Sequence, residues 1–356
     1  MKINILTNYD FISYYFMYPL LLNKEKLADL DILIKYHDKI NENIVNCDTL
    51  LIDSKFFRNY WKDKRDCVIS LLQCFREKCK QIIWLDTTDS TGATHFQVLP
   101  YVDKYWKKQL LKDVKLYERK YFGARIYTDY YRTHFKLNHK TSYSVEPIKK
   151  EHVDKLACSW NLGLGPIMVN TNITKMFRRI PWIIKEKLKY KYENKCHLPS
   201  TNRTKDICFR GSFQYNNDAL SLQRKKTIEK LIDRGVESKP IKYKNYIEEI
   251  RKSKIAVSPF GAGEICFRDF EIFLAGAVLF KPSMSHVKTY PEVFLDNESY
   301  IPFNWDFSDF NEKLDYLLQN KETLETISQY AQDTYKNYLS KWGQEEFCQR
   351  LFVMLK

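Results

Sequence analysis

The sequence predicts an α/β fold with two domains, each built around a mostly parallel sheet. Its 356 residues are enough for roughly two domains of ordinary size, each with its own core. Hydrophobic residues make up 44% of the chain and aromatic residues 15%, which is typical of a folded globular protein. Short apolar runs alternate with helical patterns in both halves, and this alternation favours parallel strands joined by helical crossovers.

In the first half, apolar runs predict strands at 2–6, 31–36, 49–53 and 81–85. Helices are predicted at 11–22 and 67–80. A further strand is expected at 99–103, leading into a Trp- and Lys-rich helix at 105–112. Because ligands of parallel sheets collect at the carboxyl ends of the strands, we expect functional residues in the loops that follow them.

The loop after the fourth predicted strand, in WLDTTDSTGATH, contains candidate catalytic residues. Asp86 and Asp89 lie in a Thr/Ser/Gly-rich turn directly after an apolar run, where a general base or an acceptor site can be built. A structural alternative is that Asp86 caps the strand end and Asp89 bonds to its own loop. His95 is a third candidate, and a lone histidine can equally be structural.

The second half is organised around KIAVSPFGAGEICFRDFEIFLAGAVLFKP, residues 254–282. This segment predicts a strand, a Gly/Pro turn at 259–263, a helix at 264–274 that stops at Gly276, and a second short strand at 278–280. A glycine loop that leads into a helix N-terminus places free backbone N–H groups and the positive helix end at one point. Phosphate or pyrophosphate is the expected ligand.

Within this segment, SPFGAGEICFRDFEIFLAGAVLF resembles the donor site of GT-B glycosyltransferases of the group-1 and exostosin-like families. The resemblance implies two Rossmann-like domains that face each other across a cleft, with a nucleotide sugar held by the second. In those families a glutamate just before an Ala-Gly pair is expected to bind the ribose hydroxyls, and Glu271 with Ala275 and Gly276 matches it here. The group-1 pattern has another acid eight positions earlier, where this chain has Gly263 followed by Glu264.

The resemblance also implies a set of donor-binding residues. FRGS at 209–212 resembles the first strand and turn of the donor domain, where basic side chains neutralise the diphosphate. Arg210 is the first choice because a guanidinium matches phosphate oxygens, and Arg224 is the second, with a surface cation as its alternative. The predicted set is Arg210, Gly211, Ser212, Arg224, Gly261, Gly263, Glu264, Arg268, Glu271 and Lys281. The alternative for Glu271 is a helix-surface acid paired with a lysine or arginine.

Four parts are predicted along the chain: an acceptor-side domain (1–165), a basic interdomain segment (166–205), a nucleotide-sugar-binding domain (206–335) and a C-terminal helix (336–356). By resemblance, the last helix crosses back to the first domain. Eight basic and two acidic residues in Lys175 to Lys195 are interleaved with large apolar side chains. This pattern fits an interfacial helix on anionic lipid, or an ordinary amphipathic helix packed between the domains.

Charge and cysteine content restrict the partners. Fifty-eight Lys and Arg against 44 Asp and Glu give a formal charge of +14, which attracts nucleic acid, anionic lipid or phosphorylated substrates. The nine cysteines are odd in number and contain no CxxC pair, which argues against a disulfide framework or a zinc site. No DxD follows a strand, so no metal is predicted, and the nucleotide sugar is a co-substrate rather than a cofactor. The expected location is cytoplasmic, peripheral on the inner face of the cell membrane.

The function predicted from these features is a metal-independent glycosyltransferase. It moves a sugar from a nucleotide-sugar donor to a glycan or lipid-linked acceptor, in cell-surface polysaccharide or lipopolysaccharide synthesis. The alternatives are a basic nucleic-acid-binding protein and a non-catalytic scaffold at the membrane surface. A nucleic-acid binder predicts a continuous basic stripe, whereas only the cluster at 175–195 is found, so no nucleic acid is expected as a partner.

Overall fold

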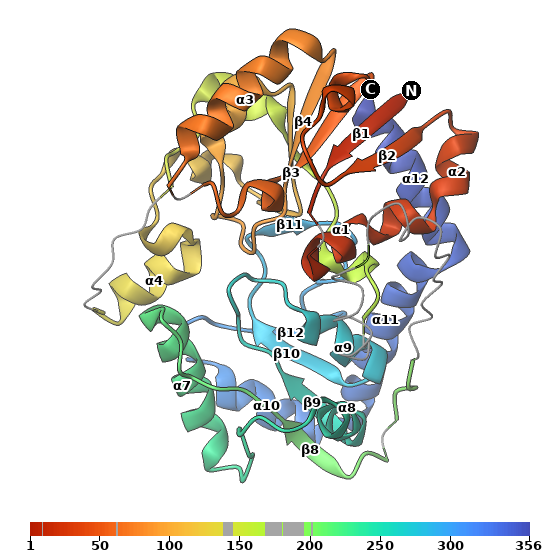
Figure 1. Cartoon of the computed structure of the whole chain (residues 1–356). Coiled ribbons are helices and arrows are strands. Elements are labelled where there is room, and N and C mark those ends of the chain that lie inside the picture. The colour runs from red at the N-terminus through yellow and green to blue at the C-terminus, as the bar shows by residue number, and fades with distance from the viewer. Residues whose placement is uncertain (9, 62, 138–144, 168–179, 181–195, 201) are drawn as a thin grey trace.

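Two parallel sheets form the centres of two α/β domains, which confirms the predicted fold class (Figure 1). A computed structural model of the chain describes all residues except 9, 62, 138–144, 168–179, 181–195 and 201. The segment predicted to lie on a membrane, 175–195, therefore falls outside the described residues apart from Ile180. Within the described ranges, no helix has the length and apolar character needed to cross a bilayer.

The first sheet contains six parallel strands. Their spatial order is β2 (Leu33–His37), β1 (Lys2–Leu6), β3 (Thr49–Asp53), β4 (Gln81–Asp86), β5 (Lys104–Lys107) and β7 (Leu156–Cys158). Every residue of β3 is buried, as expected for a strand covered on both faces. On β4, Ile82 and Trp84 join a core cluster with α3 (Arg65–Lys78), whereas Ile83 and Leu85 face a cluster that continues into the second domain.

The second sheet has four parallel strands, β12 (Ile301–Phe303), β10 (Val278–Pro282), β9 (Ser253–Val257) and β8 (Lys205–Cys208). Its helices are α7 (Asp218–Ile232), α8 (Tyr243–Lys252), α9 (Phe267–Ala275), α10 (Phe310–Gln319), α11 (Lys321–Leu339) and α12 (Lys341–Leu355). Those of the first domain, besides α3, are α1 (Phe11–Leu22), α2 (Lys24–Asp29) and α4 (Ile126–His134). Short 3-10 turns occupy Glu42–Val45, Ser54–Phe57, Phe96–Tyr101, Val114–Glu118, Phe122–Ala124, Lys150–Lys155 and Leu162–Leu164.

Two predictions in the first domain are wrong. The expected strand at 99–103 is mostly a 3-10 turn (Phe96–Tyr101), and the expected helix at 105–112 forms β5 and the short strand β6 (Gln109–Leu111). The reason is burial: Trp106, Lys107 and Lys108 are all at least 98% buried, whereas an amphipathic helix would keep its lysines in water. Lys107 and Lys108 therefore lie in the interior of the protein rather than on a solvated helix face.

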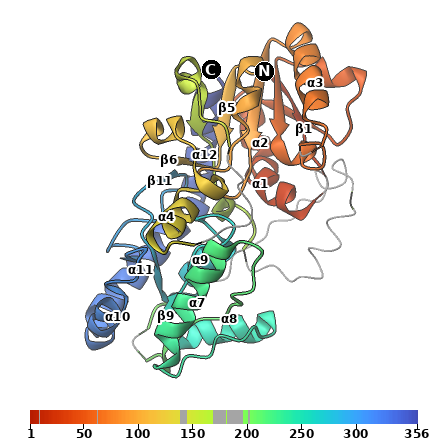
Figure 2. The ribbon, with the colours of Figure 1, turned by 90° about the vertical axis from the view of Figure 1, so that its left-hand side faces the viewer.

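Several contacts hold the two domains together. Strand β6 of the first domain pairs antiparallel with β11 (Val287–Thr289) of the second. Helix α4 lies beside α7, where Gln223 Nε2 donates to the Tyr131 hydroxyl at 3.0 Å (Figure 2). Helix α12 runs back along the first domain and ends near the N-terminus (Figure 1), with Lys104 Nζ donating to the Met354 carbonyl at 2.6 Å.

The tightest contact joins two loops. Gly263, in the loop between β9 and α9, lies so close to the loop after β4 that an added Cβ would stand 1.5 Å from the Asp89 carbonyl oxygen. Gly261 lies two residues earlier. The atoms nearest to a Cβ added there would be 4.0 Å away, which is an ordinary contact distance. The close approach between the domains therefore requires a glycine at position 263 but not at position 261.

Gly263→Ala should accordingly destabilise the protein by roughly 1–3 kcal/mol, because the added methyl group forces two backbone segments apart. Gly261→Ala is the matched control in the same loop and should change the free energy of unfolding by less than about 0.5 kcal/mol. Urea unfolding of both variants measures the difference. Equal stability of the two variants would show that the loops are not in the contact described.

Candidate functional site

The loop after β9 leads into the N-terminus of α9, as predicted. Helix α9 begins after Cys266, whose backbone N–H donates to Asp269 Oδ2 at 2.9 Å, and ends at Gly276 in the left-handed conformation (φ 66°). Lys281 forms a fully buried ion pair with Asp269 at 3.1 Å. The Lys281 ammonium is therefore committed to the core of the second domain and does not point to a ligand.

Two arginines lie side by side at this loop without a carboxylate partner among the described residues. Arg224, on α7, is 7% exposed and stacks over the Tyr215 ring with 4.8 Å to its centroid. An added Cβ on Gly211 would lie 2.9 Å from Arg224 Nη1, so the guanidinium is wedged against the turn after β8. Arg268, on α9, donates to the Arg210 carbonyl at 2.6 Å. Arg224 Nε and Arg268 Nη1 have no hydrogen-bond partner in the described structure.

Neither arginine has a carboxylate within ion-pair distance among the described residues, although the charge of Glu271 acts on Arg268. Burial lowers the pKa of Arg224, and the neighbouring charge of Arg268 lowers it further. Arg224 is buried and Arg268 is partly buried, and two cations that repel each other in such positions are costly unless an anion neutralises them. A diphosphate provides two adjacent negative groups, and guanidinium forks match phosphate oxygens. The pair is thus suited to a diphosphate.

The other residues predicted after β8 have protein partners. Arg210 donates to Glu249 through Nε (2.6 Å) and Nη2 (2.8 Å) and to Glu237 through Nη1 (3.0 Å), and Glu249 is the main reason that its pKa is raised. Gly211 donates its N–H to the Ser238 carbonyl, and the Ser212 hydroxyl accepts from Gln214. The guanidinium of Arg210 is therefore largely engaged, and its predicted contact with phosphate stays a prediction.

Glu271 is not the surface acid of the alternative interpretation. It is 8% exposed on α9, and its Oε1 accepts a hydrogen bond of 2.9 Å from the Tyr243 hydroxyl of α8. Burial raises the pKa of Glu271, while the Tyr243 hydrogen bond and the charge of Arg268 oppose that rise. The carboxylate thus lies close to the arginine pair.

Glu264, predicted to bind the donor, connects the two domains instead. Its Oε2 accepts from the Thr91 N–H (3.0 Å) and from Gln109 Nε2 (2.7 Å), and its Oε1 accepts from the Thr91 hydroxyl (2.6 Å). His286 Nε2 lies 3.6 Å from Oε1. Glu264 is fully buried, so both of its oxygens are occupied by the protein.

Asp86 and His95 lie in the interior of the first domain. Asp86 has no exposed surface and accepts hydrogen bonds from Lys107 Nζ (3.0 Å) and from the Tyr105 hydroxyl. Burial alone would raise the pKa of Asp86, but Lys107 and its other partners hold it at about 2. His95 contacts the Trp61 ring at 4.3 Å between centroids, and burial lowers the pKa of His95 to about 4. These contacts fit the structural alternative for Asp86 and keep His95 neutral at pH 7.

Asp89 is the predicted catalytic residue that is open to solvent. Its side chain is 49% exposed, and its carboxylate lies 3.4 Å from the ammonium of Lys108, which is 2% exposed. Burial alone would raise the pKa of Asp89, but the charges of Lys108, Lys55 and Arg125 lower it overall. Asp89 is therefore ionised at neutral pH and lies beside the Gly263 loop.

Sequence reasoning missed the cations around Asp89. Lys108 was assigned to a solvated helix, and nothing in the local sequence distinguishes Lys55 or Arg125 from surface cations. Arg125 crosses to the second domain, where its Nε donates to the Ala262 carbonyl at 2.7 Å. The available signal was WKKQLL, in which two lysines interrupt an otherwise strand-like run.

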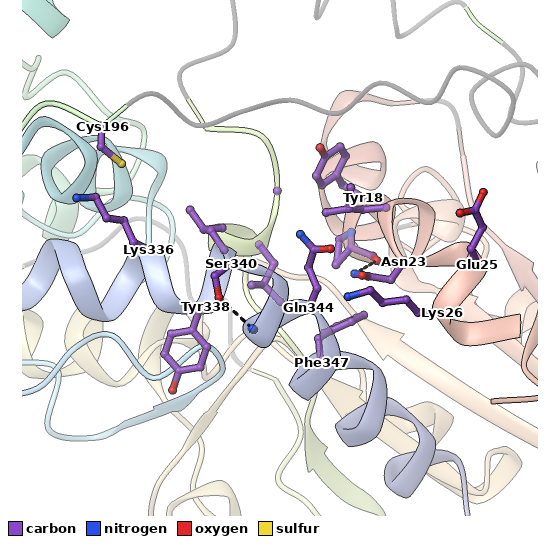
Figure 3. Close-up of a pocket in the computed structure, with 16 residues that line it drawn as sticks. Tyr18, Asn23, Glu25, Lys26, Cys196, Lys336, Tyr338, Ser340, Gln344 and Phe347 are labelled. Carbon is purple, nitrogen blue, oxygen red and sulfur yellow. Dashed lines mark hydrogen bonds between the residues drawn. The ribbon is translucent and has the colours of Figure 1, made fainter. Parts of the chain in front are cut away.

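A separate pocket opens between α1, α2, α11 and α12 (Figure 3). Its volume is about 630 Å³, and its walls include Tyr18, Lys26, Gln344 and Phe347. None of the predicted catalytic or donor-binding residues lines it. The candidate site is therefore the contact region between the β4 loop and the β9–α9 loop.

Residues 203–343 match the family model described as "Glycosyl transferase-like". The match covers most of the second sheet and its helices, including the arginine pair and Glu271. Together with the two Rossmann-like domains, it confirms the predicted resemblance to GT-B glycosyltransferases. No curated protein sequence matches the chain significantly.

Solved structures similar to the chain include glycosyltransferases. An alpha-glucosyltransferase in complex with UDP and a 13-mer DNA has 10% identity and a TM-score of 0.45, with 100% of both chains covered. HepE of Anabaena in complex with UDP has 9% identity and a TM-score of 0.45, covering 100% of this chain and 99% of that one. The C-terminal domain of LpcC, a group 1 family protein from Francisella tularensis, has 15% identity and a TM-score of 0.29, covering 42% of this chain and 100% of that one. At these identities no substrate or site residue can be transferred from them.

The buried ammonium of Lys108 should make the stability of the protein depend on pH. Burial lowers the pKa of Lys108 to about 8, although Asp89 opposes the shift, whereas Lys55 and Lys107 add to it. The cost of burying the charge is therefore complete below pH 8 and disappears as the pH approaches the ordinary lysine value. Lys108→Met, which keeps the volume, should be more stable than the wild type at pH 7 by up to about 3 kcal/mol.

This advantage of Lys108→Met should shrink between pH 8 and pH 10. Urea unfolding of both proteins at pH 7.0 and 9.5 measures it. If the difference in unfolding free energy is the same at both pH values, the ammonium is not held in the low-polarity position described.

Proposed function

We propose that the chain is a glycosyltransferase that uses a nucleotide sugar, with the donor in the second domain and the acceptor at the carboxyl edge of the first sheet. The observation that carries this proposal is the pair of Arg224 and Arg268 beside the start of α9, neither of which has a carboxylate within ion-pair distance among the described residues. The glycosyl transferase-like match over 203–343 supports it, because both arginines lie in the matched region. The acceptor is proposed to be a glycan or a lipid-linked sugar of cell-surface polysaccharide or lipopolysaccharide synthesis.

In this proposal the second domain binds the donor and stabilises the leaving group. Negative charge grows on the diphosphate as its bond to the sugar breaks, and preorganised cations at that position lower the barrier. We assign this role to Arg224 and Arg268, with N–H groups at the start of α9, rather than to a metal ion. Glu271, next to Arg268, would accept hydrogen bonds from the ribose hydroxyls.

In the same proposal Asp89 acts on the acceptor. It is ionised, half exposed and adjacent to the Gly263 loop, so it could accept the proton of an acceptor hydroxyl as that oxygen attacks the anomeric carbon. Attack by an acceptor activated in this way inverts the anomeric configuration. The buried carboxylates of Asp86 and Glu264 would then position loops and domains without contacting the substrate.

Donor binding is tested with a thermal-shift panel of UDP, GDP, CMP and ADP. One nucleoside diphosphate should raise the melting temperature by several degrees, because a ligand of the folded state stabilises it by mass action. Arg224→Ala should weaken that nucleotide's binding by roughly 1.5–3 kcal/mol, the size of a lost charged hydrogen bond. Arg234→Ala is the matched control, since Arg234 pairs at the surface with Asp315.

Two outcomes count against this part of the proposal: no nucleotide stabilises the wild type, or Arg224→Ala and Arg234→Ala bind it equally well. Arg210→Ala belongs in the same panel. A loss of nucleotide affinity in that variant would support the contact predicted for Arg210, whereas lower stability with unchanged affinity would assign it to its ion pairs with Glu249 and Glu237.

Ribose recognition by Glu271 is tested with the stabilising nucleotide and its 2′-deoxy form. The wild type should prefer the ribonucleotide, because a carboxylate can accept from both ribose hydroxyls. Glu271→Gln should reduce this preference, and Glu271→Ala should bind both nucleotides equally. Calorimetric affinities measure the ratio. An unchanged preference in Glu271→Ala would assign Glu271 to its hydrogen bond with Tyr243 alone.

A further inference from the structure

We propose that the carboxyl edge of the first sheet binds an anionic group on the acceptor, a phosphate or a carboxylate, through Lys55, Lys108 and Arg125. This inference rests on the proposed function in one respect, namely that the ligand at this edge is the acceptor. The anion site itself is argued from the first domain alone and is tested separately from donor binding.

The topology brings the relevant residues to one place. Strands β3, β4 and β5 are neighbours in the sheet and run parallel. Lys55 follows β3, Asp89 follows β4 and Lys108 follows β5. Because the carboxyl ends of parallel strands share one edge, these three side chains surround the same point. The 3.4 Å between the Lys108 ammonium and the Asp89 carboxylate agrees with that placement.

Two of the four cations at this edge have a carboxylate partner, and two do not. Lys107 is neutralised by Asp86 at 3.0 Å, and Lys108 by Asp89 at 3.4 Å. The ammonium of Lys55 and the guanidinium of Arg125 have no carboxylate within ion-pair distance in the parts of the chain that the structure describes. Both nevertheless lie near enough to Asp89 for their charges to lower its pKa. These two cations therefore lack an ion-pair partner at an edge that also holds the buried carboxylates of Asp53 and Glu264, which accept hydrogen bonds from Ser, Thr and Gln side chains.

The surroundings of these cations explain why they are suited to binding an anion. Lys108 is 2% exposed and its ammonium lies 5.2 Å from the centre of the Phe16 ring, so it cannot extend into bulk water as a surface lysine does. Arg125 is fixed by its hydrogen bonds to the Ala262 and Gly123 carbonyls, at 2.7 and 3.0 Å. Cations held in place and partly stripped of water bind an anion with little loss of side-chain entropy.

The position of Arg125 also places the bound anion relative to the donor. Ala262 belongs to the same loop as Gly261 and Gly263, so the guanidinium touches the segment that leads into α9. An acceptor anchored by its anionic group would hold a hydroxyl between Asp89 and the donor loop. Arg224 and Arg268 serve the diphosphate from the second domain, so the two anions would be bound by different sets of cations.

The test measures binding of three probes to the full chain by calorimetry: glucose 6-phosphate, glucuronate and neutral glucose. The protein is first saturated with the nucleotide that stabilises it most, so that the arginine pair is occupied. At least one of the two anionic probes should bind, and glucose should not bind measurably. Comparison of the two identifies the anion as phosphate or carboxylate. Lys55→Ala should weaken anion binding by about 5- to 10-fold, in line with one lost charged contact.

Lys78→Ala provides the matched control. Lys78 is an exposed lysine in the last turn of α3, before β4 begins, so it lies at the opposite edge of the same sheet. Its removal changes the net charge equally and should leave probe affinity unchanged. Equal weakening by Lys55→Ala and Lys78→Ala would overturn the inference, since the effect would then be one of net charge.

The remaining outcomes separate this site from the donor site. In one outcome the nucleotide displaces the anionic probes, and Arg224→Ala abolishes their binding whereas Lys55→Ala does not. The probes then bind at the diphosphate position, so the inference fails while the proposed function stands. If no nucleotide binds, the probes are titrated into the free protein. Binding that depends on Lys55 then supports the anion site while the proposed function fails. If neither probe binds, the inference is overturned.

Discussion

The buried carboxylate of Glu264 is the constraint on which the relative position of the two domains depends. Its charge belongs to the second domain, where His286 lies 3.6 Å away, but Thr91 and Gln109 of the first domain donate hydrogen bonds to both of its oxygens. A buried carboxylate without donors is unfavourable by several kcal/mol, so the donor loop and the β4 loop are held in contact. That contact is also what brings Asp89 beside Gly263 and defines a single site from two domains.

The site combines two kinds of charged residues. Asp86 with Lys107 and Asp269 with Lys281 are fully buried pairs, one in each domain, whose charges cancel within the protein. Around them lie Arg224, Arg268, Lys55 and Arg125, which have no such partner among the described residues. Paired charges fix loop positions, whereas unpaired ones create a positive potential in the region between the loops.

The sequence was sufficient for the strands whose residues are apolar throughout, and for the β9–α9 segment, because strand, glycine loop and helix are consecutive there. It was insufficient wherever a partner lies far along the chain. Arg210 was chosen for its position after β8, but its partner Glu249 is 39 residues away. Glu264 was assigned to the donor because its hydrogen bond with Thr91, which lies 173 residues earlier, could not be predicted from the sequence. Lys108 was missed because buried strands are recognised by apolar residues. The lysines between β5 and β6 interrupt that apolar pattern, so a helix was predicted instead.

The path of α12 has a consequence for synthesis on the ribosome. This helix follows the second domain in the chain, yet it covers the first sheet: Lys104 and Gln81 donate to the carbonyls of Met354 and Leu355, and Arg350 donates to that of Cys158. Domains commonly fold in the order in which they emerge. Here the surface of the first domain that α12 covers stays exposed until the second domain and α12 have been translated.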